Sequence, residues 1–284
     1  RLQRCPHRAR LASSPSAGQG SDMLADLSRL LCLASACAAY LAPLPAQTRQ
    51  PGSVVRAVHM QAPATEKAPK SFVQTEMRGA AMKLHTRDQS KEGEQAAEKP
   101  VAKWEPGRAE YLQFLVDSRH VYQCFEEIVD SNDELATFGD SGLERVAALD
   151  KDIAWFKSEG LETPPLGRIG EEYAARLREI AAAGQWPVFT CHFYNFYFAH
   201  TAGGRMIGKM MADKLLDGRT LEFYQWERGD PKEELLPALR QQIDNMAAGW
   251  TREEKDACLA ETAATFKGGG SLLNYLREPQ GSSA

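Results

Sequence analysis

The segment CHFYNFYFAHTAGGRMIGKM, from Cys191 to Met210, is the most informative stretch of the sequence. Five aromatic residues occupy six positions, and the pair Gly203–Gly204 then interrupts a helical pattern that continues beyond it. Each glycine inside a helix costs about 1 kcal/mol relative to alanine, so the pair requires a compensating gain. Missing Cβ atoms let a flat group approach the backbone, or let the helix kink. Close helix–helix packing at the Gly204-x-x-x-Gly208 spacing is the alternative, and both interpretations stay open at this point.

The rest of the body repeats the 3–4 spacing of apolar residues that is typical of helices. No stretch alternates apolar and polar residues long enough to predict a strand. The sequence therefore predicts an all-α, single-domain bundle of about seven helices without an internal repeat. We expect these helices, the last one weakened by Gly268–Gly270, over about 71–90, 109–129, 143–156, 171–183, 188–216, 232–248 and 252–277.

A candidate binding histidine lies in the segment FVQTEMRGAAMKLHTRDQ, from Phe72 to Gln89. His85 sits beside an apolar stripe, and Arg78 lies seven residues earlier, on nearly the same face and about 10 Å along the helix axis. That separation suits a flat dianionic ligand whose centre meets the imidazole and whose acidic edge meets the guanidinium. A single helical histidine is more commonly a satisfied core or surface residue, so spacing alone leaves both interpretations open.

Charge divides the chain into two parts. Residues 1–70 carry nine Lys/Arg and three Asp/Glu, a net charge of +6, whereas the remaining 214 residues carry 25 basic and 35 acidic groups, a net charge of −10. A body this acidic excludes a general nucleic-acid coat, because phosphate binding needs a surplus of cations on one face.

The first 70 residues are typical of a targeting leader. From Met23, a short region with Arg29 precedes an apolar run of thirteen residues. This run is too short to span a bilayer. The pattern therefore predicts a signal peptide over about 23–46. The basic Pro/Ala/Thr-containing segment 47–70 predicts an organelle transit sequence. Together they resemble the two-part plastid addresses of algae, so we expect a largely disordered leader and a plastid location, with plain secretion as the alternative. Untranslated sequence and an incomplete gene model are both open interpretations of residues 1–22.

Only three of the six cysteines, Cys124, Cys191 and Cys258, belong to the body of the chain. They are widely spaced and form no Cys-x-x-Cys motif, so they predict neither a disulfide framework nor a zinc site. We expect buried or half-buried free thiols in a reducing compartment.

The body as a whole resembles haem oxygenase of the plant and algal plastid type. The strings KLHTRDQ and CHFYNFYFAHTAGGRMIG are the most specific, and FLVDSRHVYQCFEEI, LERVAALDKDIAWF and WTREEKDACLAET extend the similarity from about Ser71 to Leu276. The leader is not included. The resemblance implies a haem oxygenase domain over 71–280 with a short tail at 281–284, in which haem is sandwiched between a proximal helix and a kinked distal helix.

The resemblance also implies a role for individual residues. His85 would be the axial ligand of the haem iron, bound as a neutral imidazole, and Gly203–Gly204 would bring distal backbone close to bound dioxygen. At the family's positions for binding the haem propionates, this chain has Arg78, Tyr194 and Arg240. Tyr122 lies at the position that anchors distal water, and Phe266 lies at a position of the pocket wall. An exposed helical arginine and a packed core tyrosine remain the alternatives for Arg240 and Tyr122.

Three positions depart from the animal and bacterial members. Those relatives carry an aspartate that orders distal water where this chain has His200, a histidine that the plastid branch shares. Ala199 replaces a glycine four residues before Gly203, which would tighten the pocket. Apolar Leu236 replaces a basic propionate partner, which leaves fewer cations at the haem edge.

The implied reaction is oxidative cleavage of haem to biliverdin, carbon monoxide and ferrous iron. Haem, with its iron, is substrate and cofactor together, and dioxygen is the co-substrate. A plastid location implies reduced ferredoxin as electron donor, with biliverdin feeding bilin pigments through a downstream bilin reductase. We expect a monomer with no membrane span in the mature protein. Because ferredoxins are acidic, docking on this acidic body requires a local cationic patch; the candidates, against solvated helix faces as the alternative, are Lys83, Arg87, Arg205 and Lys209.

Two other functions are compatible with such a bundle. A haem-binding module without turnover would be marked by loss of the axial histidine, and His85 is present. The second alternative is another enzyme on the same architecture, such as a thiamin-degrading or di-iron carboxylate protein. Di-iron sites need paired Glu-x-x-His motifs, and the chain offers only the lone Asp117-Ser-Arg-His120.

Overall fold

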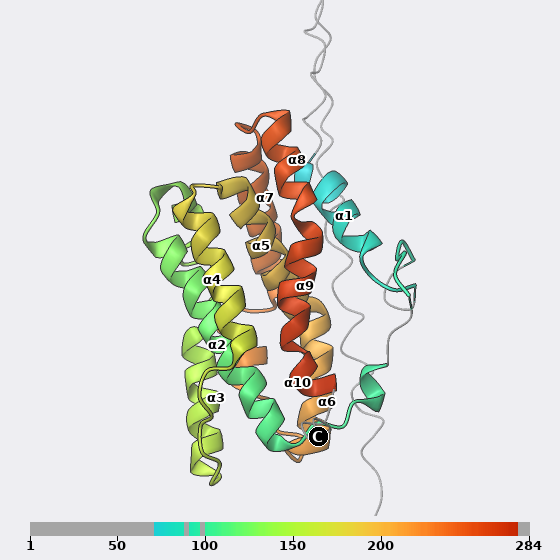
Figure 1. Cartoon of the computed structure of the whole chain (residues 1–284), viewed down its shortest axis with the longest axis vertical. Coiled ribbons are helices and arrows are strands. Elements are labelled where there is room, and N and C mark those ends of the chain that lie inside the picture. Colours follow the sequence, from blue (N-terminus) through green and yellow to red (C-terminus); the bar gives the residue numbers. More distant parts are fainter. Residues whose placement is uncertain (1–70, 88–90, 97–99, 278–284) are drawn as a thin grey trace, which may run out of the picture. The chain divides into compact units, whose positions relative to one another are not determined.

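The computed structural model of the chain describes residues 71–87, 91–96 and 100–277. The predicted leader at 1–70 and the tail at 281–284 lie outside these ranges. The described part is helical (Figure 1), and its one β-type contact is an isolated bridge between Thr86 and Gln95. The predicted all-α class is therefore confirmed.

The α-helices of the described residues are α1 (Arg78–Lys83), α2 (Arg108–Asp130), α3 (Val146–Ser158), α4 (Arg168–Ala182), α5 (Trp186–Ala199), α6 (Arg205–Leu215), α7 (Leu236–Ala247), α8 (Arg252–Ala260), α9 (Thr262–Leu272) and α10 (Asn274–Arg277). Shorter helical turns of π or 3₁₀ type join them: η1 (Val73–Met77), η2 (Val101–Lys103), η3 (Asp133–Phe138), η4 (His200–Gly204), η5 (Glu222–Tyr224) and η6 (Pro231–Leu235). Within the described ranges, no helix combines the length and the apolar character that a membrane span requires.

The observed helices follow the predicted ones, with two differences. The first predicted helix ends at Lys83 instead of reaching residue 90, because the chain turns back: Glu94 N–H donates to the Lys83 carbonyl at 3.0 Å, and Gln95 N–H donates to the His85 carbonyl at 3.1 Å. The predicted helix over 252–277 is divided into α8, α9 and α10. The long predicted helix over 188–216 is present as α5, η4 and α6, in which the π turn η4 contains both glycines.

The aromatic run of α5 fills the core against α2. Phe125 of α2 lies with its ring centroid 5.3–6.0 Å from four rings of α5, those of Phe189, Phe193, Phe196 and Tyr197. On its other sides α2 packs along α3 and α4 (Figure 1). The aromatic cluster is thus the packing contact that fixes α5, while the glycines that follow lie beyond it.

Glycines of α9 let this helix approach the same cluster. A Cβ on Gly268 would lie 2.5 Å from the ring of Tyr173 in α4, and one on Gly269 would lie 3.2 Å from the ring of Phe196 in α5. The helix weakening expected from these glycines is therefore offset by close packing of α9 on α4 and α5.

A buried carboxylate joins three helices. Asp117 of α2 is fully buried and accepts four hydrogen bonds: from Gln113 at 2.8 Å, from the N–H groups of Gly167 and Gly170 at 2.8 and 2.9 Å, and from the Tyr275 hydroxyl at 2.9 Å. The two glycine N–H groups belong to the start of α4, where a helix leaves its first N–H groups without intrahelical partners. Asp117 therefore fixes two elements to α2, namely the start of α4 and the helix α10.

The three body cysteines are free and buried, as predicted. The Cys124 thiol donates to the Ala174 carbonyl at 3.4 Å, and burial raises its pKa to about 11. Cys191 contacts the Asn195 amide at 3.4 Å. These thiols therefore serve as small packing groups between helices.

We expect Asp117→Ala to lower the free energy of unfolding by about 3 kcal/mol, because the buried N–H of Gly170 and the partly buried N–H of Gly167 lose their acceptor at about 1–3 kcal/mol each. Urea unfolding followed by circular dichroism measures this loss. The control is Asp150→Ala on α3, whose half-exposed carboxylate pairs with Arg119 and whose loss should cost under about 1 kcal/mol. Equal midpoints for the two variants would contradict the role given to Asp117.

Candidate active site

A cavity of about 830 Å³ lies among α1, α2, α5, η4, α6 and α9. Its size is in the range of small-molecule and cofactor sites. Much of its wall is apolar, with Phe114, Phe196, Ile207 and Leu273 among the lining residues. It brings together seven residues that the sequence singled out: His85, Tyr122, Ala199, His200, Gly203, Gly204 and Phe266.

His85 enters this cavity from the turn that follows α1. Its Nδ1 lies 2.9 Å from the carbonyl oxygen of Ala81. Because a carbonyl can only accept, Nδ1 carries the hydrogen and Nε2 keeps the lone pair. The ring of Phe266 stands edge-on at 5.3 Å and 83°. In its neutral form the residue therefore presents an oriented imidazole whose Nε2 can ligate a metal.

Gly93, which the sequence analysis missed, holds the backbone of this turn. A Cβ at this position would lie 2.3 Å from the carbonyl oxygen of Thr86 and 2.5 Å from that of His85. Contacts this short between a Cβ and backbone atoms require the chain to shift. The absence of a side chain thus permits the turn in which Gln95 N–H bonds the carbonyl of His85.

The glycine pair lies in the wall of the same cavity, and the structure distinguishes between ligand approach and close helix packing as reasons for these glycines. A Cβ on Gly208 would lie 2.6 Å from the ring of Tyr224, so this glycine serves close packing. A Cβ on Gly203 would meet no atom within 4 Å, and Gly203 lines the cavity. The backbone at Gly203 is therefore bare toward the cavity, which is the arrangement expected for approach of a flat group.

His200 is held by the segment that contains η5. Its Nε2 lies 2.8 Å from the carbonyl oxygen of Phe223, and its ring stacks on the Phe223 ring at 4.0 Å and 20°. Nε2 is therefore the protonated nitrogen, and Nδ1, which lies 3.0 Å from the position of a Cβ on Gly204, is an acceptor. Burial lowers the pKa of His200 to about 3, so the imidazole is neutral at physiological pH.

Tyr122 is both a core residue and a cavity residue. Its ring contacts those of Phe196, Tyr197, His200 and Phe223 at centroid distances of 4.8–5.9 Å, and it lines the cavity. Burial raises the pKa of its phenol well above the ordinary value. The hydroxyl therefore remains protonated and can serve as a hydrogen-bond group.

Arg78, Tyr194 and Arg240 form a separate cluster and are absent from the cavity lining. Arg78 pairs with Glu92 at 3.6 Å. Arg240 lies over the ring of Phe198 at 5.0 Å, and that ring contacts Tyr194 at 4.2 Å. Burial raises the pKa of Tyr194, and the charges of Arg240 and Arg78 oppose this shift. The predicted contact of these three residues with an acidic ligand edge stays a prediction.

Several lining residues were missed by the sequence analysis. Asn195 shares one helical stripe with Ala199 and Gly203 at spacings of four, and Ser118 lies four residues before Tyr122, so spacing could have found both. Phe223 carries no such signal, because it reaches the cavity from the short turn η5, which is too brief to show a periodic pattern. The cationic residues Lys267 and Arg277 also line the cavity.

The donor set fits haem. The cavity offers the Nε2 of His85 on the α1 side, bare backbone at Gly203 on the η4 side and apolar rings in its wall. A flat apolar macrocycle with a central iron needs these three features.

We expect Gly93→Ala to open the turn after α1, because its Cβ would overlap the carbonyls of His85 and Thr86. Hydrogen exchange in the ligand-free protein should become faster at the amides of Glu94 and Gln95. Gly79→Ala is the control, since a Cβ there meets nothing within 4 Å in α1. Unchanged protection at both amides in Gly93→Ala would contradict the role of this glycine.

Comparison with known proteins agrees with the site. The profile of the family described as heme oxygenase matches residues 73–273. The chain is 47% identical over 213 residues to "Heme oxygenase 1, chloroplastic" of Arabidopsis thaliana, covering 73% of this chain and 74% of that protein. It is 46% identical over 223 residues to the protein of the same name from Oryza sativa subsp. japonica, covering 78% and 76%.

The fold is also similar to that of a solved structure. The crystal structure of heme oxygenase-2 from Synechocystis sp. PCC 6803 in complex with heme and NO superposes with a TM-score of 0.54 at 16% identity, over 72% of this chain and 85% of that one. At this identity the likeness concerns the fold alone. The family match and the identities over most of the chain together show that the chain belongs to the haem oxygenase family.

Proposed function

We propose that this haem oxygenase binds haem through His85, uses the bare backbone of Gly203–Gly204 as the distal roof, and takes its electrons from a reduced ferredoxin in a plastid. The observation that carries the proposal is that the free Nε2 of His85 and the uncovered backbone at Gly203 line one cavity. Haem supplies the iron at which dioxygen is activated, and the products are biliverdin, carbon monoxide and ferrous iron.

The proximal side supplies a neutral ligand. His85 donates its Nδ1 hydrogen to Ala81 and keeps Nε2 for the iron. A neutral imidazole would donate less electron density to a bound iron than a thiolate does, and the haem would supply the iron chemistry by which its own ring is oxidised. Phe266, edge-on to the imidazole, limits its rotation.

The distal side orders water without exchanging protons itself. His200 is neutral and presents Nδ1 as an acceptor, while Tyr122 keeps its hydroxyl proton. We assign to His200 the ordering of distal water, because its acceptor nitrogen adjoins Gly204. Ala199 narrows the same wall.

The acidic edge of haem is assigned to Arg78, Tyr194 and Arg240. Both arginines act electrostatically on the phenol of Tyr194, so two positive charges gather beside one hydroxyl. This gathering supports a role in binding two carboxylates. Buried Leu236 offers no charge there.

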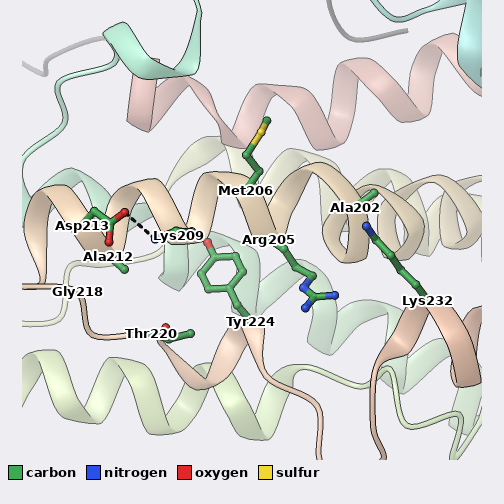
Figure 2. A pocket seen from close by; sticks show the side chains of 10 residues that line it. All are labelled: Ala202, Arg205, Met206, Lys209, Ala212, Asp213, Gly218, Thr220, Tyr224 and Lys232. Atoms are coloured by element: carbon green, nitrogen blue, oxygen red, sulfur yellow. Dashed lines mark hydrogen bonds and ion pairs between the residues drawn. The ribbon is translucent and has the colours of Figure 1, made fainter. Parts of the chain in front are cut away.

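The docking of ferredoxin is assigned to the outer side of α6. Arg205 and Lys209 line a second pocket, of about 540 Å³, together with Lys232 (Figure 2). Met206, 60% exposed, projects from the same helix and away from Tyr224. A cationic patch with one exposed apolar side chain suits an acidic partner protein. The other candidates, Lys83 and Arg87, line neither this pocket nor the cavity.

The cations of this patch are partly neutralised in the free protein. Arg205 pairs with Asp230 at 2.9 Å. Lys209 pairs with Asp213 at 3.0 Å (Figure 2). Both pairs are exposed, so each is weak and open to exchange for a partner's carboxylates. α6 directly follows η4, which places a donor bound here one helix away from the cavity.

The plastid location is supported by the names of the relatives, which are described as chloroplastic. We assign the signal peptide at about 23–46 and the transit segment at 47–70 to this import, with 71–280 as the mature domain. Biliverdin made there would pass to a bilin reductase.

We expect His85→Ala to abolish biliverdin formation, because the cavity loses its ligating nitrogen. Added imidazole should restore part of the activity by supplying that nitrogen. Soret absorbance and the biliverdin band, followed with haem, dioxygen and a reductant, measure binding and turnover separately. His120→Ala, a histidine of α2 outside the cavity lining, should behave as the wild type; full activity of His85→Ala would refute the axial role.

We expect Lys209→Glu to raise the KM for reduced ferredoxin about fivefold at low ionic strength, a cost of about 1 kcal/mol for one reversed charge at an interface rim. Salt should reduce the difference through screening. The rate with ascorbate as donor should not change. Lys157→Glu, at the exposed end of α3, is the matched control, and equal KM values for the two variants would exclude docking at α6.

A further inference from the structure

The segment that holds His200 is itself held by two buried charged residues. At its start, the N–H groups of Glu222 and Phe223 donate to Oδ1 and Oδ2 of Asp152 at 2.9 and 2.8 Å. At its end, the guanidinium of Arg145 donates to the carbonyl of Gln225 at 2.5 Å. Asp152 is 2% exposed and Arg145 is 6% exposed. Buried charges are costly unless they are fully hydrogen-bonded, so these bonds define the path of the segment.

Asp152 acts on the same residue that orients His200. Phe223 donates its N–H to Asp152, and its carbonyl accepts from His200 Nε2 at 2.8 Å. The ring of Phe223 also stacks on the imidazole at 4.0 Å. The direction of His200 Nδ1 in the cavity therefore depends on the backbone of Phe223, and that backbone depends on the Asp152 carboxylate.

We propose that Asp152 is a positioning residue for the reaction: from α3, outside the cavity lining, it fixes through Phe223 the tautomer and orientation of His200. This inference rests on the distal role of His200 given under the proposed function. Asp152 touches neither the cavity nor its ligand, so its effect is transmitted through one residue.

Mild acid supplies a test within the wild-type protein. Burial raises the pKa of Asp152 to about 6, whereas that of His200 is lowered to about 3. The groups that face Asp152 are Arg219 and Glu222, with the phenols of Tyr111 and Tyr224. Below pH 6 the protonated carboxyl loses one of its two acceptor oxygens, while His200 is still neutral. The anchor is therefore complete above pH 6 and weakened below it.

The experiment follows the imidazole nitrogens of His200 by NMR in the ligand-free, ¹⁵N-histidine-labelled protein. The wild type at pH 7 should show a single tautomer with the hydrogen on Nε2. In Asp152→Asn the amide offers one acceptor for two N–H groups, so the signals should shift toward a mixture of tautomers. Asp150→Asn, on the exposed side of the same helix, should leave the spectrum unchanged.

Two further measurements keep the test decisive if Asp152→Asn does not fold. Wild-type protein taken from pH 7 to pH 5 should show the same shift of the His200 signals. Asp152→Glu, which keeps both acceptor oxygens, should restore the single tautomer. Signals of His200 that are constant from pH 7 to pH 5 and unchanged in Asp152→Asn would overturn the proposal.

Turnover separates this proposal from the proposed function. Asp152→Asn should slow biliverdin formation about tenfold, as a misplaced group near the reacting atoms does, while haem affinity stays within about twofold. Slower turnover with unchanged His200 signals would overturn the positioning role. Shifted signals with full turnover would support the link between Asp152 and His200 and would overturn the distal role of His200.

Discussion

The site depends on one constraint, namely that a helix packed into the core must leave its backbone bare at one point where it faces the cavity. α5 meets this constraint with its aromatic run, which fixes the helix against α2, and η4 then presents Gly203 with no atom within 4 Å of an added Cβ. The propensity cost of the glycine, about 1 kcal/mol, is small beside the aromatic burial that precedes it. The aromatic part of this continuous helix therefore supplies stability, and the adjacent glycine part leaves the backbone accessible from the cavity.

The two histidines of the cavity owe their orientation to contacts of different range. His85 donates to Ala81, four residues earlier, so one turn of chain fixes its tautomer. His200 donates to Phe223, 23 residues later, so its tautomer requires the tertiary fold. The protonated nitrogen also differs, Nδ1 in His85 and Nε2 in His200. The free nitrogen in each case is the one that the role proposed for that histidine requires.

Sequence patterns predicted most of the helices, because helices depend on local periodicity, and the resemblance to haem oxygenases pointed to seven of the residues that line the cavity. The stripe of Ala199 and Gly203 is visible in the spacing of residues on one helix. The end of α1 at Lys83 was not predictable, since it results from hydrogen bonds to Glu94 and Gln95 across a turn. Phe223 was missed for the same reason: a residue of the short turn η5 acquires its role only through contacts distant in sequence.

His85 is oriented by a contact close in sequence and His200 by a distant one, and this difference has an evolutionary consequence. The segment from Leu221 to Trp226 orients His200 through Phe223, whereas His85 is oriented by Ala81 within its own turn. Under the roles proposed for the two histidines, substitutions in this segment would impair oxygen chemistry and leave His85 able to ligate the iron. A lineage could thus turn a degradative enzyme into a carrier or sensor of the pigment by changing residues such as Gln225, which does not line the cavity.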